Sequence, residues 1–126
     1  MSDAYAKGMK IRREVLGDAH VDAAEARRSG FDEAFQTLIT EGAWGSVWAR
    51  DTLPLRERSM LTIALLAATG NFDEIAMHIR ATANTGASAE DVMEVLLHVA
   101  VYAGVPRANH AIRIARETYA EMGVEL

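Results

Sequence analysis

The chain has 126 residues, a formal net charge of −5 and no cysteine. Its length suits one domain around one core, and the missing thiols exclude disulfides, thiolate metal sites, iron–sulfur clusters and thiol redox chemistry. The acidic balance disfavours nucleic acid and anionic membranes as partners. No run reaches the roughly 20 apolar residues of a membrane span, and the polar start is unlike a secretory signal. We therefore expect one cytoplasmic domain over residues 1–126.

The first half of the chain has a helical pattern. Ala, Leu, Glu, Arg and Met dominate the long segments, and strand-like alternation is absent. The spacing predicts helices over residues 3–15, 21–28 and 31–40. In the third of these, Phe31, Phe35, Leu38 and Ile39 share one face. Segment 41–50 holds two glycines and both tryptophans, so it is either a helix end followed by a loop or an irregular short helix.

The second half has clearer helix boundaries. Its pattern predicts helices over residues 55–69, 72–85, 89–103 and 106–122. Pro54 and Pro106 stand at helix starts, and Gly70 and Gly86 at helix ends. The pairs Asn71 with Glu74 and Ser88 with Asp91 have capping-box spacing. Because the connections are short, successive helices should lie antiparallel. The predicted fold is an all-α, single-domain bundle of about six to seven helices.

The helix over residues 55–69 is apolar on nearly all sides between Met60 and Ala68. A bundle of this size encloses few positions completely, so part of that surface should meet another subunit. We therefore expect a homo-oligomer.

Two histidines follow a carboxylate by one helical turn. Glu74 precedes His78 and Glu94 precedes His98, at the spacing that places both side chains on one helix face, and Tyr102 extends the second row. A carboxylate orients a neighbouring imidazole and raises its pKa, which suits a general acid or base near neutral pH. Such pairs also arise by chance on helices rich in Glu, so the spacing alone leaves both interpretations open.

The same four side chains are of metal-ligand types. Carboxylate di-metal bundles, however, use Glu-x-x-His, with one residue fewer between carboxylate and imidazole, and the zincin pattern is absent as well. We expect no metal.

Arginines gather around the turn into the helix over residues 55–69. They are Arg50, Arg56 and Arg58, and Arg80 follows later in the chain. Converging guanidinium groups bind a small dicarboxylate through bidentate hydrogen bonds. Most surface arginines instead form weak ion pairs at helix ends. Trp44 and Trp48 likewise suit either core packing or the wall of a ligand site.

Five segments form a series along almost the whole chain. They are RREVLGDAHV (12–21), GAWGSVWAR (42–50), LRERS (55–59), HIRATANTG (78–86) and EVLLHVAVYAGVP (94–106). Together they resemble the 4-carboxymuconolactone decarboxylases. The resemblance implies an all-α bundle of the AhpD-like type and a homo-oligomer, specifically a hexamer. It also implies a cofactor-free enzyme of the protocatechuate branch of the β-ketoadipate pathway, acting on a small carboxylate lactone.

The related AhpD-like alkylhydroperoxidases resemble the chain over its central helices. Their chemistry needs Cys-x-x-Cys shortly before a histidine, and the matching positions before His78 hold Asn71 and Glu74. Neither residue forms a disulfide, so thiol peroxidase activity is excluded.

The resemblance also implies roles for particular residues. It implies that a lactone loses CO₂, with His78 donating the proton and Glu74 either orienting His78 or sharing the proton. Candidates for substrate contact are Arg50, Arg58 and Arg80 as a carboxylate clamp, Trp44 as a wall, His98 and Tyr102 as donors to the carbonyl, and His20 at a neighbouring subunit's site. We expect His110 to be structural.

Two other functions stay open. One is a non-catalytic relative that binds a small carboxylate or acts as an oligomeric scaffold. The other is a decarboxylase or lactone-processing enzyme for a different small carboxylate. Asp51 and Thr52 stand where the resembled family often has Pro-Gly, which makes the substrate less secure than the reaction class.

Overall fold

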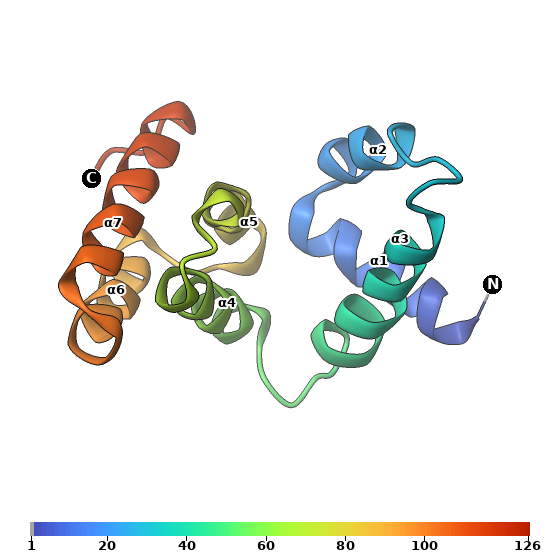
Figure 1. The fold of residues 1–126 in the computed structure, drawn as a ribbon, viewed down its shortest axis with the longest axis horizontal. Helices are drawn as coiled ribbons and strands as arrows, with labels where there is room; N and C mark the ends of the chain where they lie inside the picture. Colours follow the sequence, from blue (N-terminus) through green and yellow to red (C-terminus); the bar gives the residue numbers. More distant parts are fainter. Residues whose placement is uncertain (1) are drawn as a thin grey trace. The chain divides into compact units, whose positions relative to one another are not determined.

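The structure is a computed structural model that describes residues 2–126, and its regular elements are all helices (Figure 1). The chain divides into two compact units, which meet in sequence at Pro54 and Leu55. The first unit holds α1 (Asp3–Leu16), α2 (Asp18–Ala26), α3 (Glu33–Leu38) and the π-helix η1 (Ile39–Trp48). The second holds α4 (Leu55–Thr69), the 3₁₀-helix η2 (Phe72–Glu74), α5 (Ile75–Thr85), α6 (Ala89–Ala103) and α7 (Val105–Glu121). The all-α prediction is confirmed, and the single domain stays a prediction.

In the first unit, α1 and η1 pack with their backbones in contact. Gly8 of α1 faces the carbonyl oxygen of Thr40, and Gly45 of η1 faces the carbonyl oxygen of Ala4. A Cβ atom at either glycine would overlap the opposing oxygen. These two positions therefore have to be glycine for the helices to approach so closely.

Segment 39–48 forms an irregular helix rather than a loop. The amide of Ala49 donates to the carbonyl of Trp44 at 2.9 Å, and the hydroxyl of Ser46 donates to the carbonyl of Glu41 at 2.9 Å. The backbone bond from Ala49 to Trp44 spans five residues, the spacing of a π-helix, and the Ser46 side chain adds a further bond within the same segment. Of the two structures predicted for residues 41–50, the irregular short helix is confirmed.

Two predicted helices of the first unit have different bounds. The helix predicted over residues 21–28 is α2, which begins earlier, at Asp18, directly after Gly17 with its φ of 89°. The helix predicted over residues 31–40 was too long: α3 begins at Glu33 and changes into η1 at Ile39. The face predicted to be apolar is open, since Phe31, Phe35 and Leu38 are 99%, 58% and 67% exposed.

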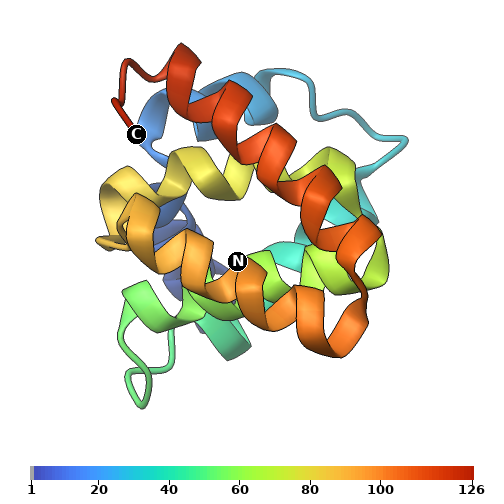
Figure 2. The same cartoon turned by 90° about the vertical axis from the view of Figure 1, so that its left-hand side faces the viewer.

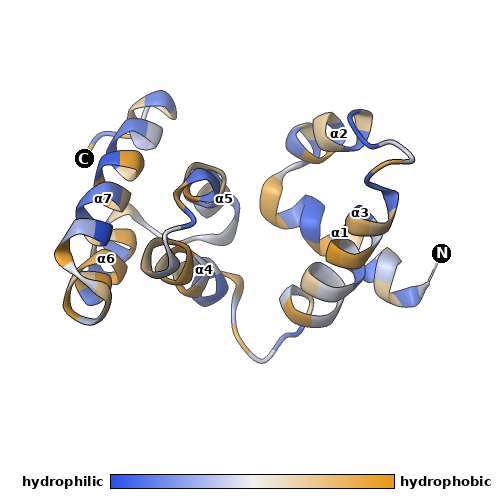
Figure 3. Ribbon diagram, viewed as in Figure 1, coloured by the Kyte–Doolittle hydropathy of each residue, from blue (hydrophilic) through white to orange (hydrophobic). Residues whose placement is uncertain are grey.

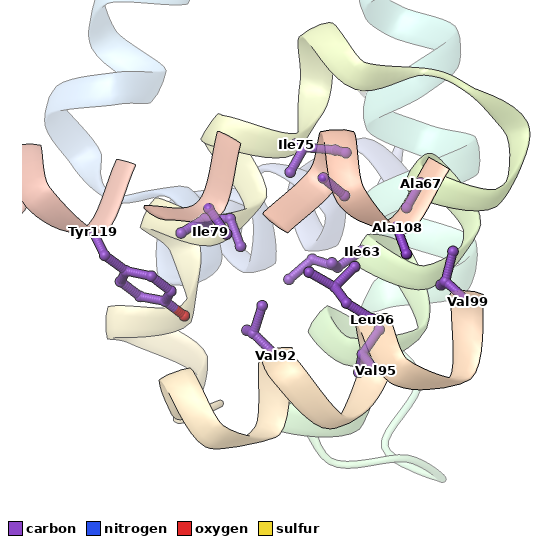
Figure 4. Packing of buried hydrophobic residues seen from close by; sticks show 12 residues of the cluster. Ile63, Ala67, Ile75, Ile79, Val92, Val95, Leu96, Val99, Ala108 and Tyr119 are labelled. Atoms are coloured by element: carbon purple, nitrogen blue, oxygen red, sulfur yellow. The ribbon is translucent and has the colours of Figure 1, made fainter. Parts of the chain in front are cut away.

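In the second unit, α4 packs against α5, α6 and α7, and α6 packs against α7 (Figures 1 and 2). One buried apolar cluster joins these four helices (Figure 4). Its largest fully buried members are Ile63, Ile75, Ile79, Leu96 and Val92. Truncating one such side chain to alanine typically costs about 2–5 kcal/mol, so this cluster holds the second unit together.

Most helix ends of the second unit lie where the sequence predicts them. Helix α4 spans Leu55–Thr69, although Pro54 lies just before it rather than in its first turn. Ser88 and Asp91 form the predicted capping box of α6, and Gly86 ends α5 with a φ of 93°. A left-handed residue at this position favours glycine.

The capping box predicted at Asn71 and Glu74 is wrong. A 3₁₀ turn intervenes before α5, and the Asn71 side chain does not cap it. The Asn71 amide donates instead to the hydroxyl of Thr69 at 2.7 Å. The tight turn after Gly70 therefore shifts the start of the α-helix beyond the reach of Asn71.

Apolar residues lie along the helices of the second unit (orange in Figure 3), and several of their side chains are exposed. On α4, Leu61 and Leu65 are 51% and 63% exposed, although Ile63 and Ala67 of the same helix are fully buried. On α6, Leu97 and Val101 are exposed as well.

Over the described residues 2–126, no helix combines the length and hydropathy that crossing a membrane requires.

Candidate functional site

His78 lies on the buried face of α5, in the first half of the helix. That face repeats at helical spacing through Ile75, His78, Ile79 and Thr82, all of them buried. Only 7% of His78 is exposed, an unusual position for a polar ring. The surrounding side chains on this face are mostly apolar, so an imidazole here works in an environment with little water.

Glu74 lies at the junction of two elements. It is the last residue of η2 and the residue before α5, and its side chain is exposed. The sequence predicts Glu74 and His78 one turn apart on a single α-helix. In the structure Glu74 belongs to the 3₁₀-helix and His78 to the α-helix that follows it. The proton-donor pair stays a prediction, with one partner buried and the other at the surface.

The arginines of the second unit have different surroundings. The guanidinium of Arg80 forms an ion pair with Glu121 of α7, so this candidate clamp residue already has a carboxylate partner. Arg58 is half-buried on α4. To bind a substrate carboxylate, Arg80 would have to exchange Glu121 for it.

Arg56 joins α4 to the start of α6. It donates to both carboxylate oxygens of Asp91, at 3.0 and 2.5 Å, and also to Glu57 at 2.9 Å. Its hydrogen bond, with help from the backbone amide of Ser88, lowers the pKa of Asp91 to about 2. Arg56 therefore has a structural role.

His98 and Tyr102 lie together on α6. Their rings stack with centroids 5.1 Å apart, and both residues are exposed, Tyr102 to 80%. The predicted row along one helix face is thus present, on a surface that also carries Leu97 and Val101. Whether it reaches a substrate carbonyl stays a prediction.

The two remaining histidines lie elsewhere. His110 of α7 packs on Phe72 with ring centroids 4.0 Å apart, and its structural role stays a prediction. His20 is exposed on α2, in the first unit.

The first unit holds the tryptophans and Arg50. Trp44 and Trp48 of η1 are 7% and 8% exposed, with their rings 5.0 Å apart. Arg50, just past the end of η1, lines a hollow of about 400 Å³. The other residues that line it are Lys7, Gly45, Ser46, Ala49, Asp51 and Thr52.

Nothing in the sequence indicated that Lys7 lines this hollow. It also did not indicate that Asp51 lines the same hollow as Lys7. Lys7 lies far from Arg50 along the chain and belongs to no motif, so only the packing of α1 on η1 brings it to this hollow. Across residues 2–126, no three His, Asp or Glu side chains come close enough together to hold a metal ion.

Comparison with known proteins adds the family. The carboxymuconolactone decarboxylase family matches residues 33–117. The chain is 41% identical over 120 residues, 95% of its own length and 90% of the relative's, to a 4-carboxymuconolactone decarboxylase of Acinetobacter baylyi. The chain belongs to the carboxymuconolactone decarboxylase family. This confirms the family resemblance found in the sequence.

Two further relatives of this member of the carboxymuconolactone decarboxylase family differ in the substrate that their names give. A nitrosuccinic acid decarboxylase of Metarhizium robertsii is 36% identical over 118 residues, which cover 94% of the chain and 82% of the relative. A 4-carboxymuconolactone decarboxylase of Pseudomonas putida is 49% identical over 41 residues, 32% of the chain and 85% of the relative. Decarboxylation is common to these names, and the substrate is not.

Proposed function

We propose that the protein is a cofactor-free decarboxylase that converts 4-carboxymuconolactone to 3-oxoadipate enol-lactone. The observation that carries the proposal is the 41% identity to a 4-carboxymuconolactone decarboxylase over 95% of the chain. The step belongs to the protocatechuate branch of the β-ketoadipate pathway, and the proposed location is the cytoplasm.

The substrate itself accepts the electrons of the reaction. The bond between the γ-carbon and its carboxylate breaks, CO₂ leaves, and the electron pair passes through the ring double bond into the lactone carbonyl. The product of this step is a dienolate with negative charge on oxygen. Protonation at the α-carbon then yields the enol-lactone, so atoms and electrons balance without a metal or an organic cofactor.

The protein has three tasks in this reaction. It holds the substrate's carboxylates, stabilises charge on the carbonyl oxygen and delivers one proton. In our proposal His78 delivers the proton and Glu74 orients His78 or shares the proton. The buried, mostly apolar face around His78 supports this role. When little water is present, the electrostatic attraction between a proton donor and a developing anion is stronger.

The remaining assignments concern binding. Arg50 and Arg58 hold carboxylates, and Arg80 joins them only if it releases Glu121. Trp44 forms a wall, and His98 with Tyr102 donates to the carbonyl. His20 serves the site of a neighbouring subunit.

A homo-oligomer, specifically a hexamer, is part of the proposal. The exposed apolar side chains of α4 and α6 support it, since Leu65 is 63% and Val101 76% exposed. Apolar faces of this kind commonly mark subunit interfaces.

A second candidate is a decarboxylase for another small dicarboxylate. The 36% identical nitrosuccinic acid decarboxylase favours it, because nitrosuccinic acid also carries two carboxylates and an electron-withdrawing group. A non-catalytic relative is the third possibility.

The deciding experiment offers the purified protein 4-carboxymuconolactone or nitrosuccinic acid, each with and without EDTA, and follows loss of substrate. We expect rapid loss of the lactone that EDTA does not change. Turnover of nitrosuccinic acid alone would favour the second candidate, and turnover of neither would favour the third. Inhibition by EDTA would contradict the cofactor-free mechanism.

A further inference from the structure

The hollow at the end of η1 combines two cations with one anion. Lys7 reaches it from α1, and Arg50 and Asp51 reach it from the segment after η1. Ser46 and Thr52 add hydroxyl groups to the lining. All of these residues belong to the first unit, so the hollow is formed there.

Lys7 changes the net charge of the residues that line the hollow. Arg50 is one of the proposed carboxylate-binding residues, and Asp51 follows it directly in the same hollow. A carboxylate beside Arg50 competes with any substrate carboxylate for the same guanidinium. With Asp51 alone, the two charges would cancel. Lys7 restores a net positive charge to the hollow, which an anion needs for binding.

We propose that this hollow binds a carboxylate of a small organic anion, with Lys7 as a second cation beside Arg50 and Asp51 as the residue that tunes specificity. The inference rests on the proposed function, because that reaction supplies the class of ligand. The ligand class is a small dicarboxylate. Asp51 penalises a ligand of high negative charge in this hollow, whereas the hydroxyl of Thr52 offers a hydrogen bond to one that carries further oxygen atoms.

Lys7 has one competing structural explanation. The carboxyl end of a helix carries partial negative charge, so a lysine near the end of η1 would also stabilise that helix. The two roles differ in what they change: a helix-end role affects stability, and a binding role affects the affinity for dicarboxylates.

The test uses adipate as a saturated, unreactive probe and the fluorescence of Trp44 and Trp48, which lie on η1, the helix that also carries Gly45 and Ser46 of the hollow. We expect a saturable change in wild type, about fivefold weaker binding in Lys7→Met, and about threefold tighter binding in Asp51→Asn, as suits exposed charges. The double variant should return close to wild type. Lys10→Met, which removes an exposed lysine of α1 that does not line the hollow, is the matched control.

Three results would overturn the inference. They are no saturable response in wild type, equal affinity in Lys7→Met and Lys10→Met, and a lower melting temperature in Lys7→Met with unchanged adipate affinity. Lack of turnover by wild type would contradict the proposed function, and the adipate titration would still decide the inference.

Discussion

At the scale of single residues, His78 combines a titratable ring with burial. It is the least exposed of the candidate polar residues, at 7%, and it lies on the face of α5 that also buries Ile75 and Ile79. Burial of a polar ring costs free energy unless its nitrogen atoms are hydrogen-bonded. The proposed mechanism assigns His78 the proton that replaces CO₂.

We predict that His78→Ala lowers kcat at least about a hundredfold, the lower range for loss of a general acid. Stopped-flow or absorbance kinetics on 4-carboxymuconolactone would measure it, with circular dichroism to check that the helices persist. His110→Ala is the control, since His110 packs on Phe72 and should change stability rather than kcat. Near wild-type turnover in His78→Ala would remove His78 from the mechanism.

At the scale of elements, Asp91 organises the start of α6. Its carboxylate accepts from the amide of Ser88 at 2.8 Å, completing the capping box, and also receives two hydrogen bonds from Arg56 of α4. One side chain thus caps a helix and joins it to its neighbour. Protonation of this carboxyl would weaken both interactions at once.

We predict an acid-dependent contribution from Asp91. Because the pKa of Asp91 is lowered from 3.8 to about 2 in the folded state, its stabilising effect is complete above pH 3.8 and is lost as the pH falls toward 2. The melting temperature of Asp91→Asn should therefore lie below wild type at neutral pH and approach it near pH 2. The control is Glu90→Gln, on the same turn of α6. The difference between its melting temperature and that of wild type should not shrink toward pH 2 in this way.

The contact between α1 and η1 gives a second prediction at this scale. Gly8→Ala places a methyl group on the carbonyl of Thr40, and we expect a loss of about 1–3 kcal/mol, typical of overpacking. Gly42→Ala on η1 is the control, because nothing lies within 4 Å of its added Cβ. Chemical denaturation measures both variants, and equal stabilities would disprove the backbone contact.

At the scale of the whole molecule, apolar surface remains uncovered on both units. The first unit exposes Phe31 to 99%, and the second exposes Leu65 to 63% and Val101 to 76%. Single exposed apolar residues are ordinary, but several along one helix favour association. On α6 they stand beside the stacked pair His98 and Tyr102.

We predict that the wild type elutes as a multiple of its 13.7 kDa chain mass and that Val101→Glu dissociates it. A buried charge without a partner destabilises an interface strongly. Size-exclusion chromatography with light scattering measures both masses. Ala120→Glu, an exposed position on α7, should leave the mass unchanged. A monomeric wild type would contradict the proposed oligomer.

Much of the fold follows from the sequence alone. The bounds of α4, the capping box of α6 and the glycine end of α5 all depend on residues a few positions apart, and local hydrogen bonds determine them. The family followed as well, since its motifs are read in order along the chain. The failure at Asn71 arose where a 3₁₀ turn of only three residues replaced the expected first turn of helix.

Only the tertiary structure decided which distant residues meet. It paired Arg80 with Glu121 and Arg56 with Asp91, two contacts between helices that no local pattern in the sequence indicated. It also brought Lys7 to the hollow of Arg50 and Asp51. Helical periodicity says which side of a helix a residue occupies, but not which helix it faces. Packing between helices fixes that, through contacts such as those at Gly8 and Gly45.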